Sequence, residues 1–466
     1  MFKVYFKSVL LIILVFLSIY QTAMLWFDYP SNRNFFYSLV NDEQAVVNES
    51  NEMHDDLFFP EKISVFYGDG SKTYGVMSLS QSDSLNLVDD SIKVVFDSFD
   101  IGVLDNKQID ISELWDRSHV LIDLPYSITS ELLKKELNIK SKWIDDAFSF
   151  ERIYIFPEQE IDAYQAEQSM YKGIRIVFAD RKLTQLRSVN VQDERMQLLN
   201  DSLILYIDTL EEEQNHMFFS TKEQGLDIFE EDVLVPVNGQ AFNLLSNLYG
   251  DMYFYEGDKR DDEQLERFVS YFFVNPKSTW KTNNVNEVRF GDLESVVRYT
   301  DSGLFEYQLN YEIENPETTL SRSLRVANDF LTKDRLLNQI EYALDDFERR
   351  GSEIVLYYNY KYRNVPLIFN DLSAYSMKHP MEIVVSGNTV TKYRRIMWKS
   401  QEVVVQGSAF EVRFQKPIDD LLLIDAIQPL KLSDMYLGYR IDNVSDGAYL
   451  TWILENEEER YYVELE

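Results

Sequence analysis

The longest uninterrupted hydrophobic stretch of the chain is Val9–Phe27, nineteen residues without a charged side chain. About 20 apolar residues are needed to cross the hydrocarbon core of a bilayer as a helix. Lys3 and Lys7 precede the stretch, and Asp28 follows it. The positive-inside rule therefore predicts a cytoplasmic tail over 1–8, a single transmembrane helix, and an extracellular location for everything that follows.

The end of this stretch favours an uncleaved anchor. A signal peptide is cleaved after small residues in an A-x-A-like pattern, whereas this stretch ends in Met24-Leu25-Trp26-Phe27. Trp26 suits the aromatic belt at a membrane–water boundary. The alternatives, a cleaved signal peptide and a buried core helix, fit the length and the flanking residues less well.

Polar side chains inside the predicted membrane helix form a candidate contact with a partner helix. Ser18 and Thr22 are four residues apart and share one face, and Gln21 lies beside them. Small residues at this spacing allow close helix approach, and an amide can hydrogen-bond across the contact. The alternative is that these polar groups only lie near the outer membrane boundary.

After a polar, acidic linker or stalk over 28–61, the pattern changes to short alternating or apolar runs separated by turn residues. Such runs are typical of strands. We expect an N-terminal α+β domain over 62–240 with more sheet than helix, in which Pro125 ends a strand and Ser127 or Thr129 caps a short helix. Strands are predicted at 63–67, 73–77, 92–96, 120–124, 152–156, 174–178 and 203–207.

In the second half, a helix followed by an antiparallel meander occurs three times. The helices are predicted at 261–273, 316–331 and 418–427 from apolar residues at helical spacing. The segment 335–347 fits a helix or a strand. We predict a middle domain over 241–315 and a C-terminal domain over 316–466, both built from small α+β modules that lay helices on antiparallel sheets. The strands are predicted at 285–290, 296–300, 304–313, 354–362, 365–369, 381–385, 390–398, 435–441, 448–454 and 460–465.

Composition narrows the classes of function. The formal net charge is −34, from 45 basic and 79 acidic residues, which disfavours nucleic acid as a partner because binding requires basic side chains at phosphates. The chain has no cysteine, which excludes disulfides, thiolate metal sites and cysteine nucleophiles. Stability must therefore come from packed cores and sheets.

No motif selects a catalytic, cofactor or metal site. The four histidines, His54, His119, His216 and His379, are far apart and are interpreted as structural or solvent-facing. The glycines within residues 68–75 do not have the spacing of a phosphate-binding loop, and they indicate the tip of a hairpin. The segment 442–447 resembles the start of a calcium loop but lacks its third and twelfth ligands. We predict a protein that is not an enzyme and has no cofactor.

Several segments resemble the YycH (WalH) family of membrane-anchored regulators. They are the anchor ending in Leu25-Trp26-Phe27, the run Phe272-Phe-Val-Asn-Pro276 after a helix, the hairpin at Val297–Gly303, and the C-terminal Leu437-Gly-Tyr and Tyr449-Leu-Thr-Trp452, which are also similar to YycI. The resemblance implies an α+β ectodomain of about three domains and favours a strand over 335–347.

The resemblance also implies a function. It implies a non-enzymatic, extracytoplasmic protein that binds and modulates a sensor histidine kinase of the YycG/WalK kind, together with a YycI-like membrane protein, in a two-component system that controls cell-wall metabolism. Two alternatives come from other classes. One is a binding protein for a small molecule or cell-wall fragment, and the other is a wall hydrolase that uses two carboxylates.

Overall fold

A computed structural model describes most of the chain after residue 57. The predicted cytoplasmic tail, transmembrane helix and most of the stalk lie outside the described residues. No described helix is both long enough and apolar enough to cross a membrane. The described residues are 58, 60–68, 72–77, 82–105, 109–136, 139, 141–144, 148–157, 173–212, 217–242, 244, 247–256, 259–401, 410–424, 431–442, 447–456 and 459–465.

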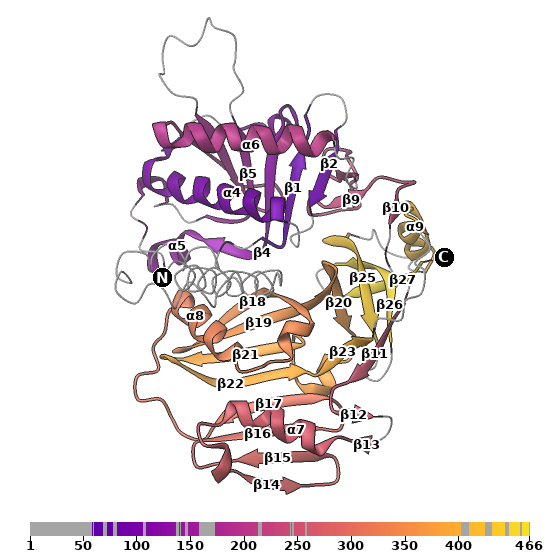
Figure 1. Ribbon diagram of the computed structural model, residues 1–466. Helices are drawn as coiled ribbons and strands as arrows, with labels where there is room; N and C mark the ends of the chain where they lie inside the picture. The colour runs from indigo at the N-terminus through magenta and orange to yellow at the C-terminus, as the bar shows by residue number, and fades with distance from the viewer. Residues whose placement is uncertain are drawn as a thin grey trace, which may run out of the picture. The chain divides into compact units, whose positions relative to one another are not determined.

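The first of two large sheets is antiparallel throughout, with the strand order β3-β7-β6-β5-β4-β1-β2-β8-β9 (Figure 1). Alternate side chains of each strand enter opposite cores: Val120 and Ile122 of β4 lie in one, and Leu121 in the other. The strands are β1 (Lys62–Phe66), β2 (Tyr74–Met77), β3 (Val103–Leu104), β4 (His119–Thr129), β5 (Ser149–Pro157), β6 (Ile174–Ala179), β7 (Leu186–Val191), β8 (Met217–Ser220) and β9 (Leu234–Pro236).

Two long helices, α4 (Ser82–Ile101) and α6 (Glu194–Glu212), lie side by side across one face of this sheet (Figure 1). The strands predicted at 92–96 and 203–207 are therefore wrong, because both segments are helical. In α6 the apolar run reads as a strand, but Leu203 and Ile207 are buried while Leu205 is 64 % exposed, which is helical spacing. Val88, Ile92, Val95 and Phe99 of α4 repeat in the same way.

The strand β4 continues past Pro125, where the sequence predicted its end. Its pairing with β5 is interrupted between Asp123 and Ile128 and then resumes. Proline has no N–H to donate, so it is tolerated at such an irregularity within a strand. Thr129 then caps the short helix α5 (Ser130–Glu136) by accepting a hydrogen bond from the Leu132 N–H at 3.2 Å, as one of the two predicted caps.

The second large sheet is antiparallel except for one parallel pair, β20 with β25. It runs from β14 at one end, through β17 and β22, to β26, β11 and β23. The predicted border between the middle and C-terminal domains, at residue 315, falls between β17 and β22, which pair with each other. The strands are β11 (Asn247–Met252), β14 (Trp280–Asn283), β15 (Glu287–Gly291), β16 (Ser295–Thr300), β17 (Leu304–Leu309), β18 (Glu341–Arg350), β19 (Glu353–Tyr362), β20 (Val365–Phe369), β21 (Met381–Ser386), β22 (Thr389–Ile396), β23 (Trp398–Gln401), β25 (Asp434–Ile441), β26 (Ala448–Glu455) and β27 (Arg460–Glu464).

The fold is thus α+β, with two large, mainly antiparallel sheets and few helices, as the sequence predicted at this level. Short strand pairs complete it: β10 (Ala241–Phe242) with β24 (Phe410–Glu411), and β12 (Tyr255–Glu256) with β13 (Lys259–Arg260). The remaining helical turns are η1 (Ile111–Trp115), η2 (Lys142–Ile144), η3 (Ser270–Phe272), η4 (Pro276–Ser278), η5 (Leu337–Gln339) and η6 (Leu372–Tyr375).

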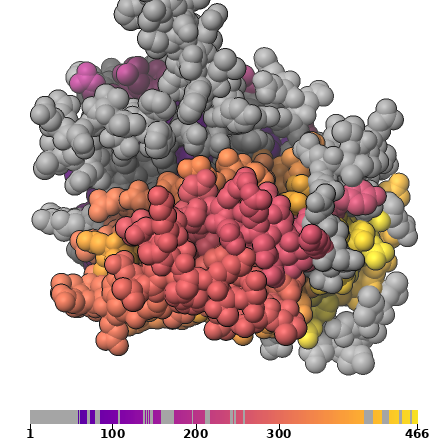
Figure 2. Space-filling view, turned by 60° about the horizontal axis from the view of Figure 1, so that its bottom comes forward, coloured from indigo at the N-terminus to yellow at the C-terminus, as the bar shows by residue number. Residues whose placement is uncertain are grey.

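The three helices predicted in the second half are present as α7 (Asp262–Val269), α8 (Leu320–Leu331) and α9 (Gln415–Ile424). Asp261 caps α7 by accepting from the Gln264 N–H at 3.0 Å, and Thr319 caps α8 in the same manner. Figure 2 shows the segment of α7 and β14–β17, pink to red, facing the viewer. The ambiguous segment 335–347 forms η5 and the first part of β18, so the strand favoured by the family resemblance is confirmed over most of its length.

A fully buried ion pair lies in the core beneath α8. Arg395 of β22 donates from Nη1 to Asp334 Oδ2 at 3.0 Å, and both side chains have no exposed surface. The Tyr393 hydroxyl donates to the same oxygen at 2.7 Å. Burial and the carboxylate of Asp334 raise the pKa of Tyr393 well above its usual value, so the hydroxyl stays protonated.

We predict that Asp334→Ala lowers the free energy of unfolding by about 3–5 kcal/mol, because it leaves Arg395 charged, buried and without its partner. Urea unfolding followed by tryptophan fluorescence measures the change. Asp329→Ala, at an exposed position of α8, is the matched control and should stay within about 0.5 kcal/mol of the original protein. Equal losses in the two variants would contradict the role of the pair.

Candidate functional site

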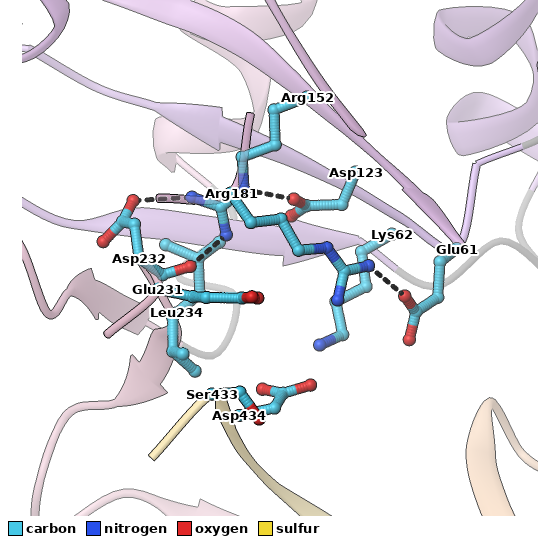
Figure 3. Close-up of a pocket in the computed structure, with 11 residues that line it drawn as sticks. Glu61, Lys62, Asp123, Arg152, Arg181, Glu231, Asp232, Leu234, Ser433 and Asp434 are labelled. Carbon is cyan, nitrogen blue, oxygen red and sulfur yellow. Dashed lines mark hydrogen bonds and ion pairs between the residues drawn. The ribbon is translucent and has the colours of Figure 1, made fainter. Parts of the chain in front are cut away.

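A small charged cavity lies at one end of the first sheet, beside the start of β25 (Figure 3). Its volume is about 20 Å³, which is room for one water molecule and not for an organic ligand. The side chains around it come from β1, β4, β5, the β6–β7 turn and the segment before β9. The lining residues are Glu61, Lys62, Asp123, Arg152, Arg181, Glu231, Asp232, Val233, Leu234, Ser433 and Asp434.

Arg152 of β5 is the centre of this cluster. Its Nε donates to Asp123 Oδ1 at 2.6 Å, and its Nη1 donates to Asp232 Oδ2 at 2.6 Å. Its Nη2 donates to the Asp232 carbonyl oxygen at 2.5 Å. The three side chains are 5, 7 and 1 % exposed, so both carboxylates are removed from water and depend on the one guanidinium.

Asp232 also organises the turn that connects β8 to β9. Its Oδ1 accepts from the Ser220 hydroxyl at 2.6 Å and from the Lys222 N–H at 3.1 Å. The Asp232 N–H donates to the Arg181 carbonyl at 2.8 Å. Asp232 therefore joins β5 and the β8–β9 turn through its carboxylate, and the β6–β7 turn through its backbone N–H.

A second, half-buried layer of charge surrounds this centre. Arg181 Nη2 donates to Glu61 Oε2 at 3.2 Å and to the Leu124 carbonyl at 2.9 Å. Burial alone would raise the pKa of Glu61, but Lys62 and Arg181 outweigh burial and hold it below the ordinary value. Burial would lower the pKa of Lys62, but Glu61 and Asp434 outweigh burial and raise it. In Figure 3 the Lys62 side chain extends toward the side of the cavity where Asp434 lies.

This arrangement serves as a structural junction. Each buried carboxylate is already bound to Arg152, so neither is positioned as a free acid or base for a substrate. Among the described residues no group of three or more His, Asp or Glu side chains could hold a metal ion. The charges connect the first sheet to Ser433 and Asp434 at the start of β25.

A second hollow is larger and open. It has a volume of about 380 Å³, within the range of small-molecule sites, and is lined by four apolar and four polar residues. The rings of Phe219 and Phe414 meet edge-to-face within it at 4.9 Å. The lining residues are Lys72, Thr73, Phe219, Gln224, Leu226, Val237, Phe414 and Gln415.

The residues singled out from the sequence are only partly placed. Ser18, Gln21, Thr22, His54 and His216 lie outside the described residues, as do the tip after Gly68 and most of 442–447. His119 has no exposed surface and packs among the rings of Phe66, Tyr74, Tyr154 and Phe156 at 4.8–5.6 Å. His379 lies 3.1 Å from Asp345 at the surface of β18.

Sequence reasoning missed the Arg152 cluster, although a signal was present. Asp123 interrupts an otherwise apolar strand, and Arg152 opens the apolar run 152–156 directly after Glu151. A charged residue inside such a run must find a partner when the strand is buried. Pairing the two charges would have required knowing that β4 and β5 are neighbours, with Asp123 directly opposite Arg152.

The fold defines a class: an α+β protein with two large, mainly antiparallel sheets. No family model matches the sequence, and no curated protein sequence matches it. The fold is similar to that in the crystal structure of YycH from Bacillus subtilis. The match covers 88 % of this chain and 96 % of the YycH chain, with a TM-score of 0.50 and 10 % sequence identity. This chain therefore has a YycH-like fold. A second match, to the YpeB C-terminal domain from Bacillus megaterium, covers 44 % of this chain and 92 % of the YpeB chain, with a TM-score of 0.24 and 12 % sequence identity.

We predict that Arg152→Met lowers the free energy of unfolding by about 3–5 kcal/mol, because Asp123 and Asp232 then remain buried without the guanidinium that binds them both. Arg175→Met is the matched control. Arg175 pairs with Glu113 at 3.2 Å in a partly exposed position, where an ion pair contributes less than about 1 kcal/mol. Chemical unfolding of both variants compares the losses, and similar values would refute the central role of Arg152.

A pH dependence follows from His119. Burial lowers its pKa to about 4, against about 6.5 in an unfolded chain. Between these values the unfolded state binds a proton that the folded state does not, so stability falls as the pH is lowered through this window, by roughly 3 kcal/mol in total. His119→Phe should lose that much less stability than the original protein between pH 7 and 4. Parallel stability curves for the two proteins would contradict the assignment.

Proposed function

We propose that this chain is a non-enzymatic regulator that binds a sensor histidine kinase of the YycG/WalK kind and adjusts its activity in a two-component system that controls cell-wall metabolism. The observation that carries the proposal is the YycH-like fold, which covers 88 % of this chain and 96 % of the YycH chain. At 10 % identity the likeness concerns the fold, so the function, the kinase and a YycI-like partner are inferences from it.

The proposed location is the outer face of the cell membrane, with 9–27 as the single anchor and the tail 1–8 in the cytoplasm. The support is the uncharged length of 9–27 and the placement of Lys3 and Lys7 before it. Ser18, Gln21 and Thr22 are the proposed contact with the membrane helices of the partner. The proposed ectodomain consists of domains over 62–240, 241–315 and 316–466.

The proposed mechanism is a shift between kinase conformations. A regulator that binds one conformation more tightly than another moves the equilibrium by its difference in affinity, and a few kcal/mol suffice. The Arg152 junction suits this role because it connects several strands and turns within the ectodomain without presenting a reactive group.

We predict that a sensor kinase copurifies with the full chain from detergent-solubilised membranes, and that replacing 9–27 by an unrelated membrane helix removes it. The reason is that the proposed contact runs through the helix face that carries Ser18 and Thr22. Co-purification followed by mass spectrometry measures the result. The double variant Ser18→Leu with Thr22→Leu keeps the anchor but fills the small-residue face, so it should lose the kinase as well.

Each outcome of this comparison is informative. Retention of the kinase by the helix-swapped chain would place the contact in the ectodomain and refute the role of Ser18, Gln21 and Thr22. Absence of any kinase from both preparations would refute the proposed regulator. The alternative, a binding protein for a small molecule or wall fragment, is favoured by the open 380 Å³ hollow. It would be supported if wall fragments bind the full chain and Phe414→Ala abolishes that binding.

A further inference from the structure

The terminal strand β14 of the second sheet has an unprotected edge. It pairs on one side only, with β15, and all four of its residues are exposed. The Asn284 N–H donates to the Glu287 carbonyl at 2.9 Å, so this is a hydrogen-bonded pair of the hairpin. Because such pairs alternate in an antiparallel ladder, Thr282 also bonds to β15. The N–H and C=O groups of Lys281 and Asn283 therefore point away from the sheet.

The pairing of β15 with β16 supports this assignment. The Asp301 N–H donates to the Asn286 carbonyl at 2.9 Å, which makes the even-numbered residues of β15 the ones that bond to β16. The odd-numbered residues, Arg289 among them, then bond to β14. The backbone N–H groups of Lys281 and Asn283 are therefore not used in the pairing with β15.

The usual protections of an edge strand are missing here. Proteins block edges with inward-pointing charges, prolines, bulges or covering elements. The one charged residue of β14, Lys281, forms ion pairs with two residues of α7, Glu266 at 2.6 Å and Asp262 at 3.1 Å. Its charge is therefore neutralised and does not block pairing at the edge. By contrast, β18 is covered by β4, where Tyr126 and Phe347 meet edge-to-face at 5.1 Å.

Exposed apolar side chains are frequent in the segment that contains this edge. Of the thirteen large hydrophobic side chains that are exposed among the described residues, six lie within 271–311, the segment that forms the forward face in Figure 2. Val285, in the β14–β15 turn, is 93 % exposed, and Leu293, in the β15–β16 turn, is 97 % exposed. An exposed apolar group beside an open edge indicates an interaction surface.

We propose that β14 pairs with β14 of a second copy of this chain, antiparallel across a two-fold axis, and so joins the two second sheets. Self-pairing fits the local charge: residues 274–286 contain two lysines and no acidic side chain, in a chain with 79 acidic residues and a net charge of −34. With so much charge on each copy, an edge that has no acidic side chain of its own, and beside which Glu266 and Asp262 are paired with Lys281, is the place where two copies can approach.

The hydrogen-bonding pattern and the length of β14 together select the register. Outward-pointing residues must face each other, and both find such a partner within β14 only when Lys281 lies opposite Asn283 of the second copy and Thr282 lies opposite Thr282 on the axis. In this register no like charges are directly opposed. Thr282 then forms a non-hydrogen-bonded pair, in which the Cα atoms are about 4.5 Å apart. A four-residue strand pair is a small interface, so the self-association is weak in solution.

The chain has no cysteine, so an introduced one is its only thiol. We expect Thr282→Cys, in the full chain in detergent with diamide as oxidant, to form a disulfide-linked dimer, because the Cα separation suits a disulfide. Ser373→Cys, at an exposed position on η6, is the control and should cross-link at least roughly tenfold less, since it has no fixed partner to raise its effective concentration. Equal cross-linking, or cross-linking of Thr282→Cys only to another protein, would overturn the proposal.

A second pair of variants tests the backbone itself. In the Thr282→Cys background, Asn283→Pro removes an outward-pointing N–H that β15 does not use, whereas Asn283→Ala keeps it. We expect the proline variant to cross-link several-fold less than the alanine variant while both melt at the same temperature. If the two cross-link equally, the edge is not the site of pairing and the proposal is wrong.

Discussion

The fold depends on one guanidinium holding two buried carboxylates. Arg152 is placed by β5, Asp123 by β4 and Asp232 by the segment before β9, so the geometry is satisfied only when all three elements have assembled. Such a cluster adds less net stability than its short distances suggest, because each charge has lost its water. Its main effect is selective: an arrangement that leaves any of the three charges unpaired is strongly disfavoured.

The class of fold and most of the second half could be predicted from the sequence, since capping residues and turn glycines mark their elements locally. Asp261 and Thr319 act as helix caps, and Gly303 and Gly387 have the positive φ that their hairpin turns require. The errors in α4 and α6 came from short apolar runs read in isolation. Apolar residues at every third or fourth position can be recognised only over a longer stretch of sequence. In addition, many of the strands against which α4 and α6 pack are distant from these helices in the sequence.

The charged junction could not be predicted for a related reason. Single charges inside apolar strands are visible in the sequence, but their partners are set by strand order, and the separations here are 29 residues for Asp123 and 80 for Asp232. The predicted membrane contact at Ser18, Gln21 and Thr22 stays a prediction. Local patterns therefore define most elements of the second half of this protein, whereas long-range pairing defines its candidate site.

The order of strands in the second sheet has a consequence for how the chain folds. The strand β11 at residues 247–252 pairs with β26 at 448–455, and β20 has β25 as its parallel neighbour. The sheet therefore cannot be completed until residues 434–455 have emerged from the ribosome. Until then β11 and β20 lack these partner strands, so we expect slow completion of this sheet and a need for protection of the nascent chain.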